Sequence, residues 1–301
     1  MFHKKEFLIA FSAMMIFAVY AVYYSIDANS PGFGWADYGI PAAEYMTAMY
    51  AMSRPGQALI YMFAFMIVLP YSMSYMAESE TGELTMILTR TSRTKYCISK
   101  VITCFIGNVI IVLVPLLINY LFCKLMYPSR PNSGYIGEYG LINYTGFILG
   151  QRSMFIQKYG VIPMASLFVN KLWLYTIVHI VLMALAGGAL GAFLVCLSFV
   201  IRSYRAILFL PVFLLVRLSV SLDQYLIQIA INNPNFEYVN FNFMNYFQIG
   251  DSRSLSPYYL PIFFGVIIVF CAVVIFAMSR TDRLLLGEVK TVGKAGKKKS
   301  A

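Results

Sequence analysis

The chain has 301 residues, of which 60% are hydrophobic and 12% are charged, and its formal net charge is +10 at pH 7. Soluble domains carry about 25% charged residues, so this composition excludes an ordinary water-soluble globular domain. Several apolar runs reach the length of about 20 residues that a helix needs to cross a bilayer, and they do not alternate in the manner of a membrane β-barrel. We therefore expect an all-α polytopic membrane protein.

Six apolar runs predict six transmembrane helices within one domain over residues 1–280, followed by a basic cytoplasmic tail over 281–301. The expected spans, in chain order, are 7–26, 57–77, 101–126, 172–201, 206–222 and 258–279. The fifth is the weakest, because it is short and contains Arg217. The first run follows two lysines like a signal peptide, but its length and the lack of a small-residue cleavage site favour a retained helix.

Basic residues are distributed unequally between the two sides of this topology. Fifteen of the 23 lysines and arginines lie in the termini and the short loops of one side, whereas the opposite loops are longer in total and hold fewer. Positive residues are retained in the cytoplasm, so both termini and the loop over 78–100 are expected there. The basic tail then faces an anionic membrane leaflet. We expect no nucleic-acid partner, because nothing aromatic or folded accompanies the tail.

The residues that usually carry chemistry are scarce. The five cysteines form no exported pair and no Cys-x-x-Cys motif, so neither a disulfide framework nor a metal site is expected. The phosphate-binding motif G-x-x-x-x-G-K-[ST] is absent, and the chain has two histidines without adjacent carboxylates. We expect no enzyme activity, no catalytic residue and no cofactor in this chain.

The loop over 78–100 is the only long charged segment between two expected spans. Leu84, Ile87 and Leu88 have the spacing of one apolar helical stripe, which predicts an amphipathic helix on the membrane surface. Acidic residues open the loop and basic residues close it, a distribution that complements a helix dipole. These residues are Glu78, Glu80, Glu83, Arg90, Arg93 and Lys95. From the pattern alone, a helix that only rests on the membrane and one that binds a partner fit equally well.

The order ExExGELxxxLxRxSRxxxxxSK in this loop resembles the segment between the second and third spans of ABC-2 type transporter permeases. The matching positions are Glu78, Glu80, Gly82, Leu84, Leu88, Arg90, Ser92, Arg93 and Lys100, and Glu83 lies within the same acidic opening. The six-span plan also fits that family. The chain departs from the family at Thr91, where proline is common, and its amino terminus is too short for the interfacial helix that members often carry.

The resemblance implies a cytoplasmic coupling helix between helices 2 and 3 that docks on a separate ATP-hydrolysing subunit. It implies two copies of that ABC ATPase subunit, which would bind ATP and Mg, and a second permease subunit, identical or paralogous. The expected function is export of an amphipathic substrate, such as a hydrophobic peptide or a lipid-like molecule, across a cell membrane, which we expect to be a bacterial plasma membrane. The family's short helices before the last span resemble the region 223–257.

The alternative function is an ion-coupled secondary transporter or a channel. Such a protein would need an acidic residue inside a span to bind the coupling ion. None of the 13 acidic residues falls well inside an expected span, and Asp223 lies at an edge. This distribution counts against the alternative.

Arg217 invites two interpretations, because a charge inside the bilayer is energetically expensive. It either extends its side chain to the outer interface, which we favour, or belongs to a substrate path or a helix pair with Asp223 or Asp251. The ten residues 223–232, DQYLIQIAIN, are too short to span and are interpreted as an interfacial or re-entrant helix. The long outer loop 127–171 is expected to hold a small subdomain.

Within the fourth span, small residues at helical spacing predict close helix packing, with a partner helix in the same chain or in a second copy. They are Ala184, Gly187, Gly188, Gly191 and Ala192. Two polar residues of the third span, Asn108 and Asn119, are expected to form interhelical hydrogen bonds, and His179 in the fourth span is interpreted as a hydrogen-bonded packing residue.

Overall fold

The structure is a computed structural model that describes residues 5–28, 47–49, 54–69, 78, 83–126, 135–137, 140–142, 164, 167, 171–201, 209–233, 240–249, 256 and 258–280. The described part is nearly all helical. Its α-helices are α1 (Lys5–Ala28), α3 (Arg54–Val68), α5 (Glu83–Arg90), α6 (Arg93–Met126), α9 (Leu172–Val200), α10 (Phe209–Asn232) and α11 (Tyr259–Arg280), with a short 3₁₀ helix, η2 (Phe243–Tyr246). Two three-residue strands, β1 (Tyr135–Gly137) and β2 (Gly140–Ile142), pair antiparallel.

Five of the described helices, α1, α6, α9, α10 and α11, are long and apolar enough to cross a membrane. The expectation of a helical membrane protein with several spans is confirmed to that extent. Helix α3 has 15 residues, which correspond to about 22 Å and fall short of a hydrocarbon core of about 30 Å. The expected second span continues to residue 77, and residues 70–77 lie outside the described part, so the sixth span stays a prediction.

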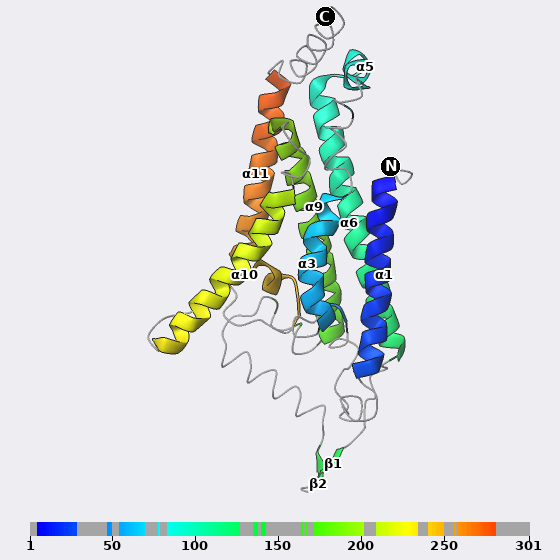
Figure 1. The fold of residues 1–301 in the computed structure, drawn as a ribbon, viewed down its shortest axis with the longest axis vertical. Helices are drawn as coiled ribbons and strands as arrows, with labels where there is room; N and C mark the ends of the chain where they lie inside the picture. Colours follow the sequence, from blue (N-terminus) through cyan, green and yellow to red (C-terminus); the bar gives the residue numbers. More distant parts are fainter. Residues whose placement is uncertain are drawn as a thin grey trace, which may run out of the picture.

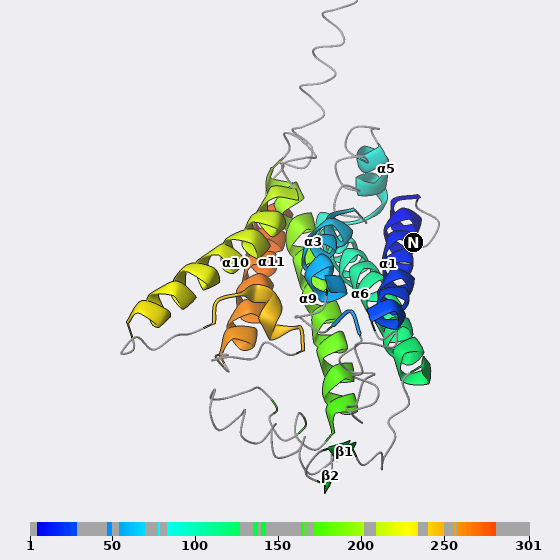
Figure 2. The ribbon, with the colours of Figure 1, turned by 60° about the horizontal axis from the view of Figure 1, so that its bottom comes forward.

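The interpretation of DQYLIQIAIN as a separate interfacial or re-entrant helix is wrong. These ten residues form the last part of α10, which runs without interruption from Phe209 to Asn232. No glycine or proline follows Pro211 within this helix, so nothing in its sequence breaks the backbone hydrogen bonding. Figures 1 and 2 show α10 leaning away from the other helices toward its Asn232 end.

Helix α9 is central to the described helices and packs against α3, α6 and α11. Its closest approach is to α6, and glycine makes that approach possible. A Cβ placed on Gly188 would lie 2.6 Å from Cγ2 of Val109, and one on Gly191 would lie 2.0 Å from Nδ2 of Asn108. Gly187 faces α3 and α6 with 3.2 Å to Val112 as its shortest contact, and Ala184 is buried. The small residues therefore pack against helices of the same chain.

Two buried asparagines on α6 differ in what they join. Asn119 accepts from the backbone N–H of Ala48 at 3.0 Å and donates to the carbonyl of Ala18 at 2.9 Å, so it links α6 to α1. Its expected role as an interhelical hydrogen-bonding residue is confirmed. The hydrogen bonds of Asn108 go to the carbonyl and the sulfur of Cys104, four residues earlier. The expected interhelical bond is wrong for Asn108, because its amide faces Gly191, which has no side chain to accept it.

Residues 240–249, part of the expected outer loop 223–257, fold into the protein rather than over its surface. Nearly all of this segment is buried against α3, α9, α10 and α11. Its backbone and side chains form hydrogen bonds to residues of α3 and α10. Gln248 donates to the carbonyl of Gly56 at 2.7 Å, and the N–H of Phe241 donates to Asp223 at 3.1 Å. The segment closes one end of the helix bundle.

Candidate functional site

Helix α5 stands at the end of the molecule where α11 finishes and α6 begins (Figure 1). It has eight residues, with Glu83 in its first turn and Arg90 in its last, so both charges complement the helix dipole. The expected helix is present at the expected place. This end is the cytoplasmic side in the topology that the basic residues predict.

One face of α5 is held against the rest of the protein and the other faces outward. Leu84 is fully buried, and Ile87 and Leu88 are half-buried against the same core. Met86 is 72% exposed, and Glu83 and Arg90 are exposed as well. The apolar stripe therefore fixes the helix, and a methionine between opposite charges is left for contact with something else.

A two-residue connection joins α5 to α6. The N–H of Thr91 donates to the carbonyl of Ile87 at 3.0 Å, and its hydroxyl donates to the same carbonyl at 2.9 Å. The N–H of Tyr96 then donates to the carbonyl of Ser92 at 3.0 Å within the first turn of α6. A proline at position 91 would lack the N–H. Threonine thus closes the turn by hydrogen bonds where the resembling family commonly has a rigid ring.

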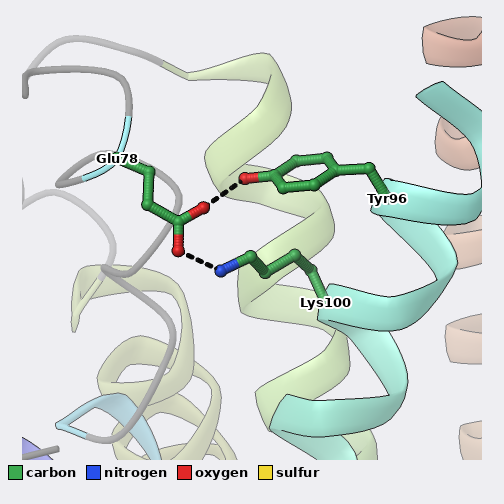
Figure 3. A network of polar contacts seen from close by, with 3 residues as sticks. All are labelled: Glu78, Tyr96 and Lys100. Atoms are coloured by element: carbon green, nitrogen blue, oxygen red, sulfur yellow. Dashed lines mark hydrogen bonds and ion pairs between the residues drawn. The ribbon is translucent and has the colours of Figure 1, made fainter. Parts of the chain in front are cut away.

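Glu78 links the residues before α5 to the first turns of α6 (Figure 3). Tyr96 donates its hydroxyl to Oε2 of Glu78 at 2.7 Å, and Lys100 forms an ion pair with Oε1. The Lys100 ammonium also lies 5.6 Å from the centre of the Tyr96 ring. The Lys100 and Glu78 side chains are only 20% and 12% exposed, so water screens this pair less than a surface pair.

The structure thus brings together two of the expected site residues, Glu78 and Lys100, through a third that sequence reasoning missed. Tyr96 lies four residues before Lys100 on α6, and residues at that spacing share one face of a helix. That spacing was the available signal. Of the other expected residues, Ser92 is exposed and Arg93 is half-buried. Glu80 and Gly82 lie outside the described residues.

Arg217 lies on α10 and reaches sideways to α3. Its Nη1 donates to the hydroxyl of Tyr61 at 3.2 Å, and both side chains are exposed. They border a pocket whose other lining residues are apolar: Ile60, Ala64, Phe213, Val216 and Val220. Asp223, one of the two expected partners, instead accepts from the N–H of Phe241. Asp251, the other, lies outside the described residues.

His179 is buried on α9 and packs as expected. Its Nδ1 lies 3.2 Å from the carbonyl of Phe247, and its ring lies 4.2 Å from that of Tyr175. Its Nε2 has no hydrogen-bond partner among the described residues. The imidazole therefore joins α9 to the inward-folded segment 240–249.

Tyr246 fixes the same segment from its other side. Its hydroxyl donates to the carbonyl of Asn240 at 2.8 Å and accepts from the N–H of Ser256 at 3.2 Å, and its ring stacks on Tyr259. Burial raises the pKa of Tyr246, the hydrogen bond from Ser256 lowers it, and the charge of Asp223 raises it further, with a net upward shift. The phenol is therefore neutral at physiological pH and acts as a hydrogen-bonding group.

Metal-ligating clusters are not found within the described ranges: no three His, Cys, Asp or Glu side chains there come close enough to hold an ion. All five cysteines are buried as free thiols. The described candidate sites are an exposed amphipathic helix at one end and a cation beside an apolar pocket on the flank.

No family model, no curated protein and no solved structure matches the chain.

Proposed function

We propose that the chain is the transmembrane subunit of an ATP-driven exporter and that a separate ATPase subunit binds at α5. The cargo would be an amphipathic molecule, and a second permease subunit would complete the pathway. The resemblance of the loop over 78–100 to ABC-2 permeases suggests this function. The proposal further places the protein in a plasma membrane with α5 in the cytoplasm.

The main support for the proposal is that the apolar face of α5 packs against the protein itself. A helix that only rests on a membrane surface needs an apolar face toward lipid. The apolar face of α5 instead packs onto the protein itself, with Leu84 fully buried. Its outward face offers Glu83, Met86 and Arg90 to a partner. A short charged helix fixed in this way is suited to bind another protein.

The connection from α5 to the membrane-spanning helices supports a mechanical role. Only Thr91 and Ser92 separate α5 from α6, and the Glu78 contacts hold the preceding residues to the same helix. Helix α6 packs closely on the glycine face of α9. A displacement of α5 by an ATPase would therefore move α6 and α9 together rather than bend a loop.

Ion-coupled transport stays the second candidate, and one observation favours it more than the sequence did. Because α10 continues to Asn232, Asp223 lies well inside this helix and is 5% exposed. Buried acidic residues inside membrane helices are typical of coupling-ion sites. Asp223 already accepts a hydrogen bond from Phe241, which also gives it a structural role. Transport that continues without any ATPase would favour this candidate.

The test is charge reversal on the outward face of α5, in the full-length chain co-expressed with an ABC ATPase that co-purifies with the parent chain. We expect Glu83→Lys and Arg90→Glu to reduce co-purification of the ATPase and the transport that depends on it. Both residues are exposed, so insertion should not change, and Tm should fall only slightly because each reversal opposes the helix dipole. Lys171→Glu is the matched control, because Lys171 is an exposed cation just before α9, at the opposite end of the bundle. Full association and transport in both α5 variants would contradict the proposal.

A further inference from the structure

Arg217 lies about a third of the way along α10, a helix that is long enough to span the membrane. It lies eight residues after Phe209 and fifteen before Asn232, the two ends of α10. At 1.5 Å per residue, these separations correspond to about 12 Å and about 22 Å along the axis. Its partner Tyr61 is likewise central in α3, seven residues from Arg54 and from Val68. The guanidinium is therefore held beside the middle of α3 and more than two turns from either end of α10.

The orientation of Arg217 does not match the interpretation that it extends to the outer interface. A snorkelling arginine runs along its helix toward the water. Arg217 instead points across to α3 and donates to the Tyr61 hydroxyl. No carboxylate lies within ion-pair distance of it among the residues that the structure describes. Its hydrogen-bond partner in the described part of the chain is a neutral phenol, which leaves the positive charge uncompensated by that contact.

A charged group in this position cannot face plain hydrocarbon without a large energetic penalty. Both Arg217 and Tyr61 are exposed in the single chain, Tyr61 to 50%. The flank between α3 and α10 must therefore meet water, an anion or a polar surface rather than lipid tails. The rest of the pocket wall consists of aliphatic and aromatic side chains. A cation and a phenol on an apolar wall fit an amphipathic anion, whose charged group pairs with the guanidinium while its tail contacts the wall.

We propose that the flank between α3 and α10 binds an anionic amphipathic molecule on its surface, with Arg217 pairing its charged group and Tyr61 holding the guanidinium in place. The pocket itself encloses only about 30 Å³, so the tail lies along the outside of the two helices. This proposal rests on the proposed export function, for which it specifies the cargo as an amphiphile that carries a negative charge. Tyr61 acts as a positioning residue, because its hydroxyl holds Arg217. The tail contacts the partly exposed side chains of Ile60, Phe213 and Val220, whereas Ala64 and Val216 are buried beneath them.

The test measures binding of dodecyl phosphate to the full-length chain in micelles of a neutral maltoside, with dodecylphosphocholine as the zwitterionic probe of equal tail length. We expect Arg217→Gln to weaken dodecyl phosphate binding about tenfold, because it removes a charge-assisted hydrogen bond. Arg217→Lys keeps the charge and should bind within about threefold of the parent chain. Tyr61→Phe should lower the affinity for dodecyl phosphate by a smaller factor than Arg217→Gln does. Dodecylphosphocholine should bind all variants equally.

Arg280→Gln is the matched control, because Arg280 is an exposed cation at the end of α11, where it lies over the Phe276 ring and away from the pocket. It should bind dodecyl phosphate like the parent. Parent-like affinity in Arg217→Gln would overturn the proposal. If Arg217→Gln keeps its affinity for dodecyl phosphate and also shifts the protein from dimer to monomer in light scattering, Arg217 faces a second copy of the chain, and the proposal is likewise overturned. Equal Tm values without amphiphile exclude misfolding as the cause of any loss.

The anion-binding proposal and the proposed export function can fail independently of each other. Neither Arg217 nor Tyr61 belongs to α5, so their variants should co-purify with the ATPase like the parent. If α5 variants keep the ATPase while Arg217→Gln loses dodecyl phosphate, the export function fails and the anion site stands as a binding property. If the α5 variants lose the ATPase while Arg217→Gln binds normally, only the cargo assignment fails.

Discussion

Charged side chains in two regions of the molecule differ in their partners and in their exposure to solvent. Around α5, Glu78 and Lys100 pair with each other and with Tyr96, and both charged side chains are mostly shielded from solvent. On the flank between α3 and α10, Arg217 is exposed and donates a hydrogen bond to the neutral phenol of Tyr61. The first region satisfies its charges within one chain. The second requires a counter-charge or water from outside, which is why the two regions suggest different roles, one in positioning a helix and one in binding.

The largest effect should come from disturbing the helix contact on which both regions depend. We expect Gly188→Leu to destabilise the protein by about 3 kcal/mol, because a Cβ there already clashes with Val109 and Phe105. The measurement is thermal unfolding in detergent, read by the loss of monodisperse protein. Gly265→Leu on α11 is the matched control, since its Cβ would meet no atom within 4 Å. Equal losses in both variants would contradict the α6–α9 packing.

Breaking the Glu78–Lys100 ion pair tests the region around α5 by itself. We expect Glu78→Gln and Lys100→Met each to lower stability by about 2 kcal/mol, because each leaves a shielded charge without its partner. The double variant should lose less than the sum of the single losses. This double-mutant cycle is measured by the shift of Tm. Strictly additive losses would show that the pair is not coupled.

The tyrosines of the two regions provide a smaller and more direct contrast. Tyr96→Phe should cost about 1–2 kcal/mol, because it removes a shielded hydrogen bond to a carboxylate at 2.7 Å. Tyr61→Phe should cost at most about 0.5 kcal/mol, because its 3.2 Å bond is exposed. The same unfolding measurement compares both. A larger loss at Tyr61 would reverse the comparison and make the flank a structural contact.

The smallest effect on stability is expected from Arg217→Leu. The change removes an exposed charge that has no carboxylate partner in the described part of the chain, so the Tm should stay the same or rise slightly. Binding of dodecyl phosphate should nevertheless fall. A substantial drop in Tm would indicate that Arg217 supports the fold, contrary to the contrast between the two regions.

Much of the fold followed from local sequence properties. Apolar runs of sufficient length predicted the membrane-spanning helices α1, α6, α9 and α11 nearly to the residue at several ends. The stripe of Leu84, Ile87 and Leu88 predicted both the existence of α5 and the face that it buries. These features could be read because hydrophobic periodicity and span length are set within a few turns of chain.

The errors concern places where distant residues decide the structure. Polar residues after position 222 suggested the end of a span, but α10 continues to Asn232, and Asp223 within it accepts a hydrogen bond from the N–H of Phe241, eighteen positions away. Asn108 was expected to join two helices, and instead it bonds to its own helix beside Gly191. The buried course of residues 240–249 had no pattern that identified it in advance, and the position of Tyr96 four residues before Lys100 indicated a shared helix face but not their common partner Glu78.

The sequence by itself determined the class of protein, the positions of the long helices and the charged helix between two of them, because composition and periodicity are local properties. Only the tertiary structure decided which charges are paired. Glu78 reaches Lys100 across twenty-two positions, and Arg217 reaches Tyr61 across 156. Such partners meet only after the helices have packed. Whether a charge is satisfied inside the chain or directed outward is therefore a property of the packed bundle.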